Sequence, residues 1–142
     1  MFQNIWQWFD EHQDLAYDLI RIYLGIALCV RGYLFIADMS LLVDLLGQQG
    51  VAWFTTTAFA HYIALAHLAG GLLLALGLFT RLAALIQLPI LFGAVFIVHL
   101  KEGLLARGQS LELAALVLFL LLIYFLFGPG PLSMDRRVLR GR

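Results

Sequence analysis

The chain has 142 residues, of which 63% are hydrophobic and 13% are charged, and its formal net charge is zero. Because a water-soluble domain carries roughly 25% charged residues, this composition predicts a protein that lies in lipid. A chain without net positive charge lacks the electrostatic footprint of a nucleic-acid-binding protein. The lone cysteine, Cys29, excludes an internal disulfide and a Cys-x-x-Cys redox pair.

The first fourteen residues place Phe2, Ile5, Trp6 and Phe9 at the spacing of one apolar helix face. Two interpretations stay open for this segment. It forms a short helix in the membrane interface, or it is a frayed lead-in whose tryptophans lie at the level of the lipid headgroups. The start is not basic, so we expect no cleavable signal peptide.

Four apolar segments follow, and each is long enough to cross a hydrocarbon core of about 30 Å at a rise of about 1.5 Å per residue. They predict an all-α fold, an integral membrane four-helix bundle in one transmembrane domain over residues 1–142, with spans at about 15–37, 58–79, 82–100 and 111–127. The more polar segment 38–57 is predicted to form a short helix, ended by glycines, that lies as a flap over the outer mouth of the bundle.

Local signals within the spans predict how the helices meet. Ala66 and Gly70, like Gly71 and Ala75, are small residues four apart, a spacing that lets helix backbones approach closely. Pro89 lacks a backbone donor and is expected to kink the third span. The last span is expected to end at the Gly-Pro-Gly-Pro sequence of residues 128–131.

The basic residues predict the orientation. With four spans, one side of the membrane receives six of them and the other receives only Lys101 and Arg107; the six are Arg21, Arg81, Arg136, Arg137, Arg140 and Arg142. The excess of basic residues marks the cytoplasmic side. Both termini are therefore predicted to be cytoplasmic.

This topology places six polar residues in the outer half of the bundle, and we treat them as candidate ligand-binding residues. Two of them lie about 10 Å below the outer surface, and four lie nearer to it; the six are Arg31 and His67, then Asp38, His61, His99 and Glu112. In the inner half, only Gln87 is expected to be comparable. Asp18 and Arg21, near the start of the first span, are expected to snorkel or to pair with each other.

An arginine within the membrane costs free energy, so such a residue is by default taken as a candidate for a functional role. Beside a histidine that passes protons, it suits an anion or a quinone carbonyl. The alternative without a functional role is that Arg31 pairs with Asp38 and reaches the outer headgroups, while His61 and His99 are ordinary interfacial residues. No spacing here demands a haem between the two histidines, and no HxxxH or HxxE spacing links His61, His99 and Glu112 as a metal site.

The stretch AHLAGGLLLALGLFTRLAALIQLPILFGAVFIVHL, followed by GPGPLSMD, resembles the DoxX family of small bacterial membrane proteins. The first span, RIYLGIALCVRGYLF, resembles the family's opening helix, so the similarity covers roughly residues 18–137. The resemblance implies four transmembrane helices with cytoplasmic termini in the bacterial inner membrane. It also implies a link to quinone-linked oxidoreductases, notably thiosulfate:quinone oxidoreductase, and to membrane partners of thiol-stress enzymes.

This chain departs from the family pattern at two positions. Arg31-Gly32, with Phe35 and no lysine, stands where the family often has His-Gly and then Lys, and His67 stands where an acid often precedes the paired glycines. We expect a subunit or partner of a quinone-linked membrane redox system whose ligand lies against Arg31 and His67, with the bilayer and a membrane protein as partners. The alternative is a non-catalytic membrane module, such as an anchor, an assembly partner or a small-solute carrier.

Overall fold

The computed structural model describes residues 1–48, 53–99 and 110–141, and this part of the chain consists of helices joined by short turns, with no strand. The elements are α1 (Phe2–Glu11), α2 (Gln13–Ala37), α3 (Met39–Gly47), α4 (Trp53–Leu76), α5 (Thr80–Gly93), the π-helix η1 (Ala94–His99), α6 (Ser110–Phe127) and α7 (Met134–Arg140). Three helical segments are long and apolar enough to cross a membrane: Gln13–Ala37, Thr56–Leu76 and Thr80–Ile97. The apolar part of α6, Leu111–Phe127, is shorter.

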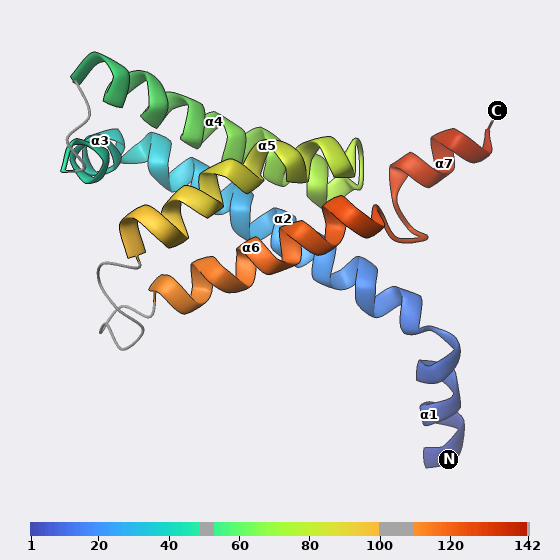
Figure 1. Ribbon diagram of the computed structural model, residues 1–142. Helices are drawn as coiled ribbons and strands as arrows, with labels where there is room; N and C mark the ends of the chain where they lie inside the picture. The colour runs from blue at the N-terminus through green and yellow to red at the C-terminus, as the bar shows by residue number, and fades with distance from the viewer. Residues whose placement is uncertain (49–52, 100–109, 142) are drawn as a thin grey trace.

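Helices α2 and α4 pack side by side through glycines (Figure 1). A Cβ atom added to Gly25 would overlap the backbone of Ala75, and one added to Gly32 would overlap the backbone of Leu68. Gly71 meets the backbone of α2 in the same way. Gly25 and Gly32 are seven residues apart and so lie on one helix face. The two backbones therefore approach as closely as glycine allows, which is how helices associate tightly in lipid.

The turn between α4 and α5 is held by the far end of the chain. Gly77 has a φ of +69° and Phe79 has a φ of +47°, so the backbone passes twice through the left-handed region. The Asp135 carboxylate accepts hydrogen bonds from the backbone N–H groups of Phe79 at 2.7 Å and Thr80 at 3.0 Å. Helix α4 ends at Leu76, slightly before the predicted end of its span, because Gly77 already turns the chain.

The apolar core lies between α2, α4, α5 and α6. Its most buried members are Leu24, Leu28, Leu74, Ala84, Leu91, Leu121 and Tyr124. Pro89 lies inside α5, which runs on to Gly93 before the backbone continues as the π-helix η1. The helix is therefore not interrupted at Pro89. The kink that we expect there stays a prediction.

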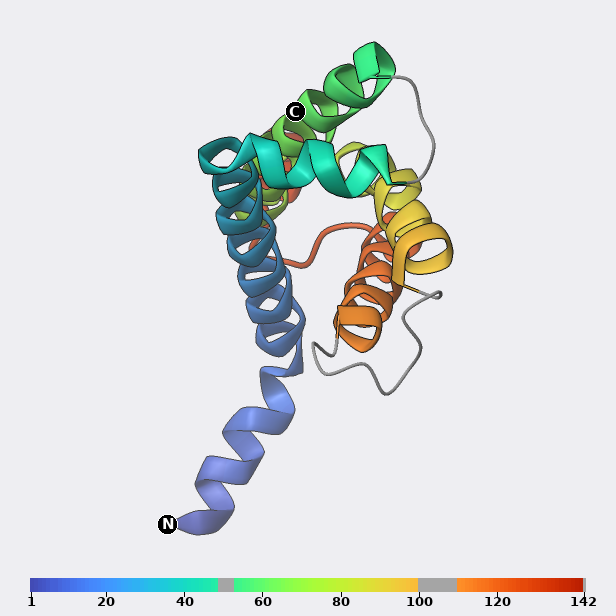
Figure 2. The ribbon, with the colours of Figure 1, turned by 90° about the vertical axis from the view of Figure 1, so that its left-hand side faces the viewer.

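The two short helices outside the core have different settings. Figure 2 shows α3 lying across one end of the molecule, where it contacts α4, while α1 projects away at the opposite end. Asp38 ends α2 and begins α3, and its carboxylate accepts from the Leu41 N–H at 3.4 Å. Helix α1 has no buried residue, and Phe2 and Trp6 on it are exposed. Helix α3 matches the short helix predicted between the first two spans.

The glycine contact between α2 and α4 generates a stability prediction. We expect Gly25→Ala to lower the free energy of unfolding by about 1–3 kcal/mol, the usual cost of an extra methyl in a filled site, because the helices must separate. Gly93→Ala is the matched control, because nothing lies within 4 Å of its added Cβ. Thermal unfolding in detergent measures both, and a Gly25→Ala protein as stable as the parent would contradict the close contact.

Candidate functional site

His67 is buried near the middle of α4, with 3% of its surface exposed. Its Nδ1 lies 2.9 Å from the carbonyl oxygen of Ile63. A carbonyl oxygen can only accept a hydrogen bond, so Nδ1 carries the proton and Nε2 of the neutral ring carries a lone pair. The ring meets that of Phe35, on α2, edge to face at a centroid distance of 5.6 Å. The helix junction therefore presents a hydrogen-bond acceptor in apolar surroundings.

Gln87 on α5 supplies a second buried polar group, on the face of α4 that meets α5. It is fully buried, and neither its Nε2 nor its Oε1 has a hydrogen-bond partner in the described part of the chain. A Cβ atom added to Gly70 would lie 2.6 Å from Nε2, so the amide packs where Gly70 lacks a side chain. Gly70 is about one turn beyond His67 on α4. We call these two side chains the His67–Gln87 site.

Arg31 lies at the edge of this site and not inside it. Its side chain is exposed, and its Cζ lies 5.6 Å from the centroid of the Phe35 ring, a cation–π distance. The sequence predicted that Arg31 and His67 both point into the bundle; His67 does, and Arg31 does not. The reason is local, because the neighbouring Gly32 faces α4 and each residue turns the helix by about 100°.

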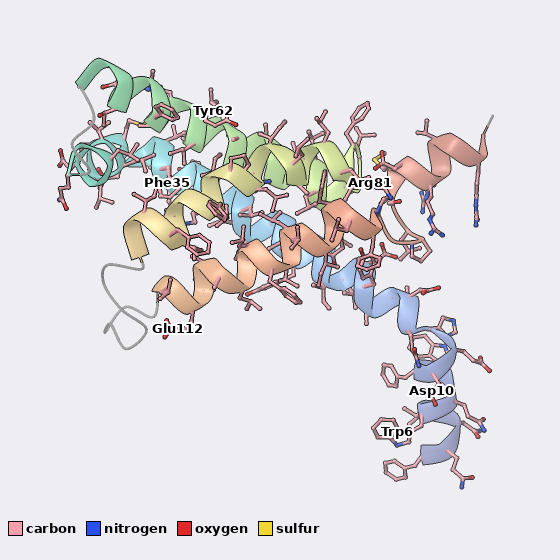
Figure 3. All side chains as sticks on the ribbon, viewed as in Figure 1. Trp6, Asp10, Phe35, Tyr62, Arg81 and Glu112 are labelled. Carbon is pink, nitrogen blue, oxygen red and sulfur yellow. The ribbon has the colours of Figure 1, made fainter. Side chains whose placement is uncertain are left out.

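The other candidates do not join this site in the described structure. Asp38 is exposed and accepts a hydrogen bond from Ser40 Oγ at 2.8 Å, so it caps α3 and does not pair with Arg31. His61 is exposed, with Nδ1 2.8 Å from the Thr57 carbonyl oxygen. Glu112 is exposed at the start of α6 and points away from Phe35 (Figure 3). The side chain of His99 lies outside the described residues.

A second polar cluster occupies the opposite end of the bundle. Asp18 and Arg21 form an ion pair with a 2.5 Å separation, and the side chains of both are 1% exposed. Arg21 Nε also donates to the Leu74 carbonyl oxygen at 3.1 Å, and the Leu132 N–H donates to the second Asp18 oxygen at 3.0 Å. Of the two outcomes expected for Asp18 and Arg21, pairing is confirmed. The prediction that only Gln87 is a comparable polar residue in this half was wrong, because the chain before α7 folds back and covers the pair.

Two tyrosines extend this cluster, which we call the inner cluster after the side that the predicted orientation gives it. Tyr17 donates its hydroxyl hydrogen to the Gly128 carbonyl oxygen at 2.8 Å, and Tyr124 donates to the Tyr17 carbonyl oxygen at 2.7 Å. These bonds join residues more than 100 positions apart in the chain. The sequence offered only one hint of these two hydrogen bonds. The predicted topology places the start of α2 and residues 128–131 on the same side of the membrane. Among the described residues, no cluster of histidine, cysteine or acidic side chains could hold a metal ion.

Apolar helices of membrane-spanning length around buried, hydrogen-bonded polar groups define a multi-span α-helical membrane protein. A match to the family described as DoxX extends over residues 16–100, more than half of the chain, so the protein belongs to the DoxX family. The matched region contains Arg31, Phe35, His67 and Gln87. No curated protein and no solved structure matches the chain.

The buried ion pair generates a second stability prediction. Removing one partner leaves a charge in the protein interior, which typically costs about 3–5 kcal/mol. We therefore expect Asp18→Asn and Arg21→Met each to destabilise the protein strongly. The double variant should lose less than the sum of the two single losses, because it leaves no unpaired charge. Thermal unfolding of the four proteins in detergent gives the coupling between the two residues.

Asp14→Asn is the matched control for this cycle, since Asp14 lies one turn earlier on α2 and is exposed. It should leave the unfolding temperature nearly unchanged. Strictly additive losses in the double variant would show that Asp18 and Arg21 do not act as a pair.

Proposed function

We propose that this DoxX protein is a subunit or partner of a quinone-linked redox system in the bacterial inner membrane, and that the quinone binds at the His67–Gln87 site. One observation carries the proposal: the fully buried Gln87 amide has no hydrogen-bond partner in the described part of the chain, and the buried His67 lies on the helix against which it packs. Leaving buried polar atoms unpaired is costly, so a ligand that satisfies them is favoured. A quinone offers polar oxygens on an otherwise apolar ring.

The two side chains have complementary roles toward such a ring. The Gln87 amide N–H group donates to a quinone carbonyl oxygen. His67 Nε2, which carries a lone pair while Nδ1–H is bound to the Ile63 carbonyl, accepts from the hydroxyl of the reduced quinone. The Phe35 ring beside His67 supplies an aromatic wall, and the exposed Arg31 adds a positive charge that stabilises an oxygen with negative character.

Electron transfer to or from the quinone requires a second redox centre, which the proposal assigns to a partner protein. The competing proposal is a non-catalytic membrane module: an anchor, an assembly partner or a small-solute carrier. The inner cluster favours it, because that end is tied together by satisfied hydrogen bonds and is built for rigidity. The two proposals differ in one measurable property, which is specific quinone binding.

We expect the purified protein in detergent to bind a short-chain quinone, and His67→Leu and Gln87→Leu each to weaken binding about tenfold. That loss corresponds to one hydrogen bond of about 1.4 kcal/mol. Intrinsic fluorescence quenching measures the affinity. His61→Leu is the matched control, because His61 makes the same Nδ1 contact with the carbonyl four residues back but is exposed.

Arg31→Leu should weaken quinone binding less than His67→Leu, because Arg31 lies only at the edge of the site. Binding that is absent in the parent protein, or equal in the parent and in the His67→Leu and Gln87→Leu variants, would overturn the quinone proposal. The non-catalytic module would then be the better account of the chain.

The proposal also assigns the membrane orientation: α6 is a fourth span, and both termini are cytoplasmic. We expect a cysteine at Gln109 to react with an impermeant thiol reagent added outside intact cells. A cysteine at Gly141, which is exposed in the structure, should react only after the cells are opened. Both variants are made after Cys29→Ala removes the native thiol, and labelling of position 141 from outside would contradict the orientation.

A further inference from the structure

An open groove of about 630 Å³ lies where the α4–α5 turn, the end of α6 and α7 meet. Figure 3 shows Arg81 at this end of the molecule, far from Phe35. Two kinds of side chain line the groove. The apolar walls include Phe79, Leu82, Phe127 and Val138, and the basic groups are Arg81 and Arg136.

The groove carries a net positive charge, because Arg81 and Arg136 line it together with the single carboxylate of Asp135. Arg81 and Arg136 are exposed, and the only ion pair among the described residues is the one between Asp18 and Arg21. The one carboxylate that lines the groove, Asp135, is already engaged by the N–H groups of the α4–α5 turn. Arg81 donates a single long hydrogen bond, 3.5 Å to the Leu126 carbonyl oxygen, so most of its N–H groups are free.

The walls are apolar and open. Phe79 is 61% exposed, Phe127 is 75% exposed and Val138 is 60% exposed. Phe127 is the last residue of α6, and Phe79 immediately precedes α5, so these side chains lie at the ends of apolar helices, where hydrocarbon meets headgroups. Unpaired arginines beside apolar surface at this depth match a molecule with an anionic head and an acyl tail.

We propose that the groove binds an anionic phospholipid. Its phosphate lies between Arg81 and Arg136, whose planar guanidinium groups bind phosphate oxygens through paired N–H groups. An acyl chain follows Phe127 and Leu82 along the lipid-facing side of α5 and α6. A zwitterionic lipid is disfavoured, because its headgroup ammonium brings a further positive charge to a groove that is already net positive.

Charge complementarity and the apolar walls together select this occupant. A soluble phosphate would use the arginines but not the exposed rings, and a neutral lipid would use the rings but not the arginines. The site is separate from the quinone proposal, because its lining shares no residue with the His67–Gln87 site.

Native mass spectrometry of the full chain, released from detergent with equal amounts of phosphatidylglycerol and phosphatidylcholine of identical acyl chains, tests the proposal. We expect the parent protein to retain phosphatidylglycerol preferentially. The double variant Arg81→Gln/Arg136→Gln should reduce that preference about tenfold, the loss that 1.4 kcal/mol of charge-assisted hydrogen bonding predicts. Arg137→Gln/Arg140→Gln removes the same charge from the same end without touching the groove and should leave the preference intact.

A variant at the apolar wall separates a lipid from a free anion. Phe127→Ala, at an exposed position, should weaken retention of phosphatidylglycerol severalfold while both arginines remain. Equal losses in the two double arginine variants would show general attraction to charge and overturn the site. Displacement of the lipid by millimolar inorganic phosphate, or no effect of Phe127→Ala, would show an anion site without lipid specificity and also overturn it.

Discussion

The buried ion pair between Asp18 and Arg21 is the interaction on which the arrangement of the helix ends depends. A buried ion pair is tolerated only when the remaining polar atoms of both side chains also have hydrogen-bond partners. Here the arginine reaches the Leu74 carbonyl at the end of α4, and the carboxylate receives the Leu132 N–H from the segment before α7. One pair on α2 therefore holds two other parts of the chain. Gly130 packs against the Asp18 carboxylate, where a larger residue would not fit.

The glycine contact between α2 and α4 positions the candidate site in turn. Since Gly32 and Gly71 bring the two backbones together, Phe35 reaches the ring of His67 across the interface. Helix α4 uses adjacent glycines for different neighbours: Gly71 meets α2, and Gly70 accommodates Gln87 of α5. The His67–Gln87 site is thus a consequence of close packing on two faces of one helix.

The two ends of the bundle differ in how their polar groups are used. At the end that holds α7, Tyr17, Asp18, Arg21 and Asp135 are satisfied by backbone atoms and by each other, which stabilises a fixed geometry. Around Gln87, buried amide atoms have no partner in the described chain, which is the condition that a ligand can relieve. Arg81 and the arginines of α7 are exposed at the same end.

The sequence by itself determined that the protein lies in a membrane, where its apolar helices lie in the chain, and that it resembles the DoxX family, because composition and apolar length are local properties. It also singled out His67 as a polar residue at membrane depth. Only the tertiary structure decided which side chains face the interior. Arg31 is exposed because its neighbour Gly32 faces α4, and Asp18 is buried because residues more than 100 positions away fold over it. The depth of a residue in the membrane follows from the rise per residue of its helix. The direction in which its side chain points relative to the other helices depends on contacts between distant segments.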